Sequence, residues 1–99
     1  MAKLITAEQS ATGYRYLACW WGVDPAFANF LVEVARDLIS DDCGYTLSAG
    51  TARGNCVNIY YPETWTTRQH KAAETKLNTV VNCYCRAEAR TQHRVGSFQ

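Results

Sequence analysis

The sequence lacks any apolar run that approaches the roughly 20 residues of a membrane-spanning helix. Its first ten residues hold one lysine and no apolar core, so we expect no secretory signal there. Without a span or a signal, the chain is predicted to have no contact with membranes and to work in a cytoplasm, a host cytoplasm if the chain is viral.

The cysteines also lack the pattern of a disulfide framework, because their number is odd and no export signal accompanies them. Five occur, and we expect free, partly buried thiols at all of them: Cys19, Cys43, Cys56, Cys83 and Cys85. Cys83 and Cys85 form a C-x-C pair, whose side chains would point about 200° apart on a helix and could not hold one ion together. The sequence therefore predicts no metal site and no cofactor.

Repeats, low-complexity stretches and linkers are absent as well, which favours a single domain over residues 1–99. Apolar residues make up 47% of the chain and argue against disorder. Residues 1–13 are polar enough to form a loose N-terminal lead-in, with room for a short strand at residues 4–6.

The first half of the chain predicts a strand followed by a helix. "YRYLACWW", residues 14–21, is rich in aromatic side chains and is typical of a buried strand. Asp24 can cap the next helix and Pro25 suits its first position. A helix over residues 25–40 would carry one apolar stripe: Phe27, Phe30, Leu31, Val34 and Leu38.

The second half predicts two strands and a long helix. "YTLSA" (45–49) and "CVNIYY" (56–61) are about six residues apart, too close for a parallel crossover, so they should pair as an antiparallel hairpin. Thr66 and Gln69 form a capping box for a helix over residues 67–90. The fold class is α+β, in the order β-α-β-β-α. A mixed three-stranded sheet would pack on two helices on one face, extra terminal strands being allowed, and the first two strands would form a right-handed parallel βαβ unit.

Charge is divided unevenly along the chain. Residues 1–52 carry three more acidic than basic side chains, whereas residues 53–99 carry four more basic than acidic ones. On the last helix, an apolar face opposes a basic stripe made of Arg68, Lys71, Lys76, Arg86, Arg90 and Arg94. The stripe is either a solvated outer face or a contact for phosphates or an acidic protein, with Trp65 as a neighbouring aromatic contact.

"GYTLSAGTARGN", residues 44–55, places Gly50 and Gly54 around a short polar segment. Backbone N–H groups of such a loop can point at an anion. Phosphate cradles usually lead into a helix, whereas this loop leads into a strand, so a hairpin turn is the favoured interpretation and a phosphate cradle the alternative.

The segment "DPAFANFLVEVARDLISDDCGYTLSAGTARGN" followed by "NIYYPETW" resembles small phage and bacterial members of the Rossmann-like SLOG/DprA superfamily, over about residues 14–65. The resemblance implies binding of nucleotides, nucleotide-derived signals or single-stranded DNA, with anion contacts at Ser48, Gly50, Arg53 and Gly54. The chain lacks the helix that the family has between these strands, and "GNC" stands where the family has an acidic residue.

No nucleophile, base and orienting acid form a recognisable set around His70 or His93, so the sequence favours a protein that is not an enzyme. The leading hypothesis is a small binding protein encoded by a phage or mobile element, which inhibits or modulates a host protein or nucleoprotein complex such as a defence system. The alternatives are a reduced SLOG/DprA-like nucleotide- or phosphate-binding module and a non-specific nucleic-acid binder that uses the basic helix. Exposed aromatics and a free strand edge would permit a homodimer.

Overall fold

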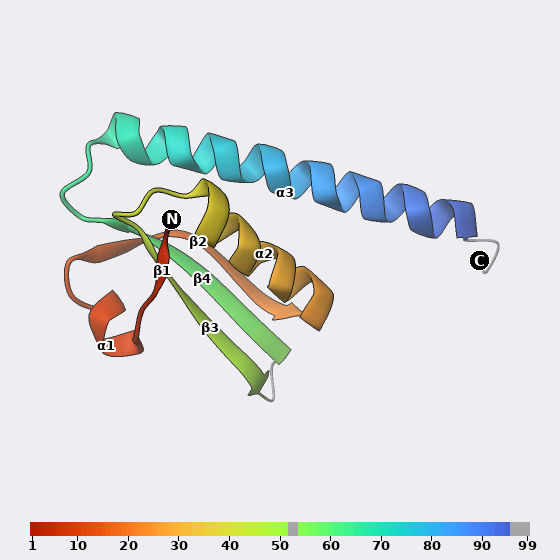
Figure 1. Ribbon diagram of the computed structural model, residues 1–99, viewed down its shortest axis with the longest axis horizontal. Coiled ribbons are helices and arrows are strands. Elements are labelled where there is room, and N and C mark those ends of the chain that lie inside the picture. Colours follow the sequence, from red (N-terminus) through yellow and green to blue (C-terminus); the bar gives the residue numbers. More distant parts are fainter. Residues whose placement is uncertain (52–53, 96–99) are drawn as a thin grey trace.

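A computed structural model describes residues 1–51 and 54–95 of the chain, and the side chains of 1–49 and 54–88 (Figure 1). The fold is α+β, as predicted. In chain order the elements are β1 (Lys3–Leu4), α1 (Ala7–Ser10), β2 (Tyr14–Val23), α2 (Pro25–Leu38), β3 (Gly44–Thr51), β4 (Gly54–Pro62) and α3 (Thr67–Val95). The strands form one mixed sheet in the order β1-β3-β4-β2.

Strand β4 lies between β2 and β3. It pairs antiparallel with β3, which confirms the predicted hairpin, and antiparallel with β2 on its other edge. Strands β2 and β3 are therefore parallel to each other, but they are not neighbours. The expected βαβ unit is split, because the hairpin keeps β4 next to β3 and α2 carries the chain across a gap one strand wide.

The N-terminal segment is more ordered than its polarity predicts. Strand β1 pairs parallel with the start of β3, and α1 follows it with a capping box between Thr6 and Gln9. Ala2 and Ile5 are buried, and the amino group of Met1 pairs with the carboxylate of Asp41. These few apolar contacts bind the segment to the domain, although it contains no continuous apolar pattern.

Both long helices begin at the residues that the sequence indicates. Asp24 Oδ1 accepts a hydrogen bond of 2.7 Å from the Phe27 amide, with Pro25 at the first helical position. At the start of α3, the backbone N–H of Gln69 donates to Thr66 Oγ1 at 3.2 Å, and the backbone N–H of Thr66 donates to Gln69 Oε1 at 2.8 Å. Helix α2 ends two residues earlier than predicted and α3 five residues later.

The core lies between one face of the sheet and the two helices. It contains residues from the strands, α2, α3 and the loop before β3: Leu17, Val34, Ala35, Ile39, Cys43, Tyr45, Ile59 and Leu77. Further along the same side, Ala28 and Leu31 of α2 pack on Val57 of β4. The predicted arrangement, with both helices on one face, is confirmed.

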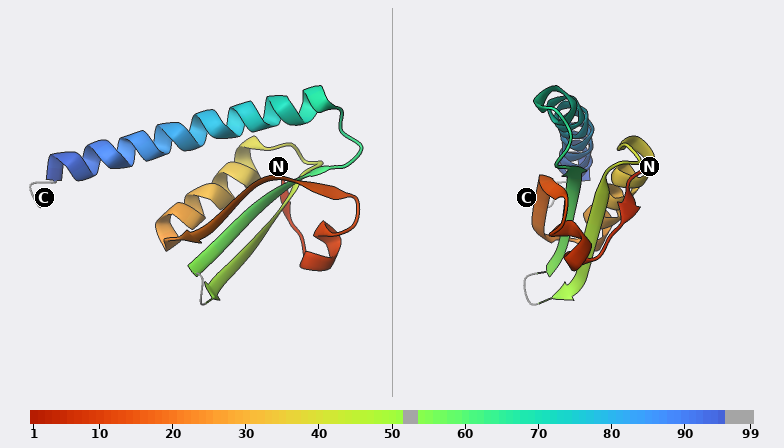
Figure 2. Two further views of the ribbon diagram at one scale, coloured as in Figure 1. Left: turned by 180° about the vertical axis from the view of Figure 1, so that it is seen from behind. Right: turned by 90° about the vertical axis from the view of Figure 1, so that its left-hand side faces the viewer.

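Helix α3 is longer than the domain it packs on. At 1.5 Å per residue, its 29 residues span about 43 Å. Figures 1 and 2 show it running past α2, with its C-terminal end extending beyond the rest of the molecule. Within residues 1–51 and 54–95, no helix combines the length and apolarity that crossing a membrane would require.

Candidate binding surfaces

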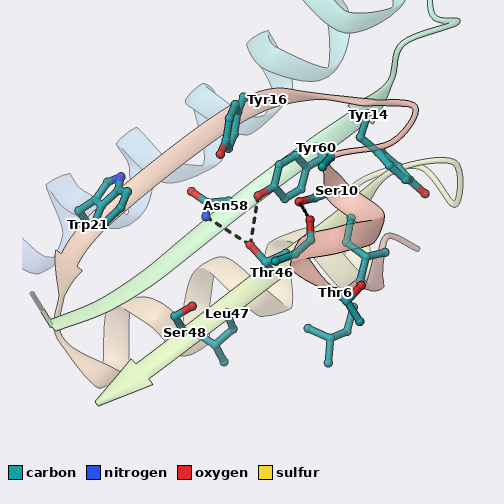
Figure 3. Close-up of a pocket in the computed structure, with 14 residues that line it drawn as sticks. Thr6, Ser10, Tyr14, Tyr16, Trp21, Thr46, Leu47, Ser48, Asn58 and Tyr60 are labelled. Atoms are coloured by element: carbon teal, nitrogen blue, oxygen red, sulfur yellow. Dashed lines mark hydrogen bonds between the residues drawn. The ribbon is translucent and has the colours of Figure 1, made fainter. Parts of the chain in front are cut away.

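The face of the sheet turned away from α2 and α3 forms a groove of about 900 Å³ (Figure 3). We call it the open sheet face. It carries side chains of β2, β3 and β4, and α1 borders it at one end. The side chains that define it are Tyr14, Tyr16, Trp21, Thr46, Ser48, Asn58 and Tyr60.

Strand alternation explains why these side chains share one face. On β4, Val57 and Ile59 point into the core, so Asn58 and Tyr60 point to the opposite side. On β2, the pairing with β4 shifts register between Tyr16 and Ala18 and again between Trp20 and Val23. Such irregularities redirect side chains, and they leave Tyr16 and Trp21 on the same face despite their odd spacing.

Two aromatic side chains on this face are largely exposed. Tyr16 keeps 66% and Trp21 59% of its surface accessible to solvent. Tyr60, in contrast, is buried in the floor of the groove, where its ring centroid lies 4.9 Å from that of Tyr16 and 6.4 Å from that of Tyr14. The buried ring supports the exposed one, so the position of Tyr16 is set by packing.

A chain of polar contacts crosses the floor of the groove. Asn58 Nδ2 donates to Thr46 Oγ1 at 3.2 Å, and Thr46 Oγ1 lies 3.4 Å from the Tyr60 hydroxyl. A hydrogen bond with Tyr60 raises the pKa of the Tyr16 hydroxyl above its ordinary value. Within the described part of the chain, Asn58 Oδ1 is buried without a hydrogen-bond partner. Buried acceptors of this kind are uncommon, because each costs about 1–3 kcal/mol.

None of the described residues that line the groove is charged. The surface offers hydroxyl, amide and indole groups beside aromatic rings. Its described lining has no carboxylate or imidazole that could exchange a proton with a substrate near neutral pH. This composition suits the binding of an uncharged group rather than acid–base chemistry.

The four residues of the predicted phosphate loop do not form one described site. Ser48 is exposed and lines the open sheet face. Gly50 lies in β3, and Arg53 is outside the described residues. Thr51 pairs with Gly54, so the segment closes the β3–β4 hairpin, which is the favoured of the two predictions. Anion binding by these residues stays a prediction.

The structure supplies a packing reason for Gly54. Its φ angle is +82°, a conformation that other residues rarely adopt. A Cβ atom at this position would lie 2.9 Å from the Cα atom of Gly22 on β2. Backbone geometry and close contact with β2 both require glycine here, independently of any ligand.

The basic stripe on α3 is accessible along its described part. Arg68, Lys71, Lys76 and Arg86 are all exposed, and none of the four lies within ion-pair distance of a carboxylate among residues 1–49 and 54–88. The hydrogen bonds of Arg86 stay on its own helix, through Nε and the Asn82 carbonyl at 3.4 Å and a guanidinium nitrogen 3.9 Å from Cys83 Sγ. The side chains of Arg90 and Arg94 lie outside the described residues.

The opposite face of α3 packs as predicted. Leu77 is 1% exposed, while Ala73, Val80, Val81 and Tyr84 are half-buried. Trp65, predicted as an aromatic surface contact, is also half-buried. It packs against the core and stacks on Tyr61, with centroids 6.0 Å apart.

Sequence reasoning missed the open sheet face because it assigned the aromatic residues of 14–21 to the core. A signal was present, since Tyr14 and Tyr16 alternate with Arg15 and Leu17 in a pattern typical of a strand with two distinct faces.

The chain matches no family model, and comparison with curated proteins and with solved structures found no similar protein.

Proposed function

We propose that this chain is a small non-enzymatic binding protein, encoded by a phage or mobile element. In this proposal it acts in the host cytoplasm, where it inhibits or modulates a host protein or nucleoprotein complex. The observation that carries the proposal is the pairing of two exposed surfaces of different chemistry on one small domain. One is the uncharged, aromatic open sheet face, and the other is the unneutralised basic stripe of α3. The phage origin rests on the resemblance described above.

The chain has enough surface for a protein interface of standard size. A standard interface buries about 800 Å² on each partner, and the chain exposes 6579 Å² in total. An interface of that size would use about one-eighth of the surface. Exposed Tyr and Trp side chains and accessible arginines are also the groups that contribute most strongly to protein interfaces.

The test is an affinity pull-down of the tagged chain from a bacterial host lysate, with and without nuclease and at two salt concentrations. We expect a protein partner in stoichiometric amount that survives nuclease treatment. The triple variant Arg68→Glu, Lys71→Glu, Lys76→Glu should lose it. All three side chains are exposed, so this variant should stay folded. Reversal of exposed acids on α2, Glu33→Lys with Asp37→Lys, is the matched control and should retain the partner. An empty pull-down at both salt concentrations would contradict the proposal.

The second candidate is a non-specific nucleic-acid binder, which the accessible cations of α3 favour. Each phosphate neutralised contributes a slope of about −0.9 to a plot of log K against log salt. Because binding releases counterions from the DNA, the affinity for duplex DNA should fall steeply between about 50 and 200 mM salt. Arg86→Glu should reduce the slope. Nuclease-sensitive capture in the pull-down would move the assignment to this candidate.

A reduced nucleotide-binding module is the third candidate, favoured by the exposed position of Ser48 in the groove. Because Gly54 packs against β2, Ser48→Ala is a better probe of this candidate than a change at Gly54. A thermal-shift screen with mono- and dinucleotides should show stabilisation of the parent chain that Ser48→Ala abolishes.

A further inference from the structure

We propose that a groove between the start of α2 and the second half of α3 binds an arginine side chain of a partner protein. The inference rests on the proposed function only in taking a protein as the occupant. The groove has a volume of about 850 Å³, and none of its residues lines the open sheet face or belongs to the basic stripe. Figure 1 shows its walls at one end of the molecule, where β2 leads into α2 and α3 runs past them. We call it the acidic groove, because the charged residues of its described lining are Asp24 and Glu88.

Most of the acidic groove is apolar. One wall comes from the end of β2 and the start of α2, with Val23, Pro25 and Phe27, and the other comes from α3, with Tyr84 and Cys85. Phe27 and Tyr84 are half-buried, and their rings stack with centroids 5.5 Å apart and an interplanar angle of 19°. Rings fixed in this way offer a surface that can cover the methylene stem of a long side chain.

The two carboxylates of the groove act on one hydroxyl group. Asp24 precedes α2, and Glu88 lies on α3, one turn beyond Tyr84. Burial raises the pKa of the Tyr84 hydroxyl, and a hydrogen bond to Glu88 and the negative charges of Glu88 and Asp24 raise it further. Two negative charges from different elements therefore converge beside the same aromatic ring.

No base in the described part of the chain neutralises this pair of acids. The lining of the groove contains neither Lys nor Arg, and within residues 1–49 and 54–88 no basic group lies within ion-pair distance of Asp24 or Glu88. Asp24 accepts from the backbone N–H of Phe27, and Glu88 shares a hydrogen bond with Tyr84. A carboxylate has about four acceptor sites, so both retain capacity for the donors of a ligand. Charge complementarity therefore favours a cationic occupant over a neutral or anionic one.

An arginine side chain matches these groups more closely than other cations do. Its planar guanidinium group stacks on aromatic faces, and its N–H donors point in several directions, so it can meet two carboxylates beside one ring. A lysine ammonium is a compact, strongly hydrated charge that gains less from an aromatic wall. A metal ion would leave the apolar walls uncovered, whereas the stem of an arginine packs against them.

The experiment measures binding of the peptide acetyl-Ala-Leu-Arg-Leu-Ala-amide to the full chain, followed by the backbone amide signals in two-dimensional NMR spectra. We expect saturable binding, with the largest shifts at residues 22–27 and 84–88. A peptide with citrulline in place of arginine keeps the shape of the side chain without its charge. It should bind about fivefold more weakly, because charge-assisted hydrogen bonds are roughly twice as strong as neutral ones. The lysine peptide should also bind more weakly than the arginine peptide.

Two conservative substitutions remove the charge of the groove and keep its local structure. Asp24→Asn retains a helix cap of equal rank, and Glu88→Gln retains an oxygen that can accept from Tyr84. The double variant should bind the arginine peptide about tenfold more weakly than the parent does, because both charge-assisted contacts are lost. The matched control is Glu33→Gln with Asp37→Asn, which changes the net charge equally on exposed side chains of α2 outside the groove. It should bind as the parent does, and far-UV circular dichroism with the melting temperature establishes that each variant is folded.

Several results would overturn the inference. The arginine peptide could fail to bind at millimolar concentration, or bind no better than the citrulline or lysine peptide. The control variant could lose as much affinity as the double variant, which would reduce the effect to net charge. N-butylguanidinium alone could bind as tightly as the peptide, which would assign the groove to a free cation. Gel filtration could show a dimer that the double variant dissociates, which would make a second copy the occupant.

The pull-down separates this inference from the proposed function. If the arginine peptide does not bind while the parent chain still captures a protein partner, the inference fails and the proposed function stands. If the peptide binds with the expected dependence on the two acids while the pull-down is empty, the proposed function fails and the arginine site stands.

Discussion

The ring of Phe30 on α2 stacks on the ring of Tyr84 on α3, with centroids 4.0 Å apart and an interplanar angle of 17°. Phe27 extends the stack, with its ring centroid 5.5 Å from that of Tyr84. Beyond Tyr84, the next four residues of α3 are exposed. Among the described ring contacts, this aromatic stack is the one nearest to the C-terminal end of α3.

Replacement of Tyr84 tests this anchor. Tyr84→Ala should lower the free energy of unfolding by about 2 kcal/mol, less than the roughly 3–5 kcal/mol of a fully buried aromatic because the ring is only half-buried. Helical content should fall as well, since the end of α3 loses its support. Urea titration followed by circular dichroism measures both. Tyr84→Phe keeps the stacked ring and should behave like the parent, and equal loss in the two variants would show that the hydroxyl is what matters.

Two glycines with nearly the same backbone angle separate conformational strain from close packing. At Gly13, with φ +81°, an added Cβ atom would meet nothing within 4 Å, whereas at Gly54, with φ +82°, it would lie 2.9 Å from Gly22 Cα. Gly13→Ala should cost about 1 kcal/mol through the backbone alone. Gly54→Ala should cost at least about 2 kcal/mol, because β2 must also move. Denaturant unfolding gives both values, and equal costs would refute the close approach.

The five thiols should differ in reactivity. Cys19, Cys83 and Cys85 are exposed, whereas Cys43 and Cys56 are buried. Burial, with a contribution from Asp42 that the amino terminus partly offsets, raises the pKa of Cys43 to about 11. With a thiol reagent at pH 8, three groups should therefore react quickly in the native protein and all five after denaturation. Fast reaction of Cys43 in the native state would contradict its burial.

The same thiol makes stability depend on pH at the alkaline end. An exposed cysteine in the unfolded chain has a pKa of about 8.5, below the pKa of about 11 that Cys43 has in the folded state. The unfolded state thus loses its proton first, and stability falls as pH rises between these two values. Cys43→Ala should flatten that part of the profile, measured as the urea midpoint at several pH values. An unchanged slope would place the titration on other groups.

The cap of α3 offers a smaller, local test. Thr66→Ala removes the acceptor for the Gln69 amide and should cost about 1 kcal/mol. Thr64→Ala, two residues earlier and also exposed, changes the same side chain outside the cap and should cost little. Thermal unfolding of both variants measures the difference, which would vanish if the cap did not contribute.

Local chemistry made much of this fold predictable. Asp24, Pro25 and Thr66 mark the two helix starts, and the six-residue spacing of two strands forces a hairpin. Nonlocal contacts account for what was missed. The position of β4 between β2 and β3 depends on pairing partners far apart in sequence, and the short β1 is stabilised by burial of Ala2 and Ile5 rather than by its own pattern.

The candidate surfaces divide in the same way. The basic stripe follows from helical periodicity and could be predicted as far as Arg86. The open sheet face could be predicted only in part, from the alternation at Tyr14 and Tyr16, because an aromatic residue such as Trp21 is equally suited to either side of a strand. The face of the sheet on which Trp21 lies is set by the register shifts in β2, and these shifts depend on the pairing of β2 with β4.

The central place of β4 also governs when the protein can acquire its structure during synthesis. A nascent chain that has emerged only as far as Thr51 contains both strands that flank β4, but it lacks the strand that joins them. Until residues 54–62 leave the ribosome, β2 has no neighbour to pair with. A chain truncated before that segment should be sensitive to proteases, and a synthetic peptide of residues 54–95, which carries both β4 and α3, should protect it when supplied in trans.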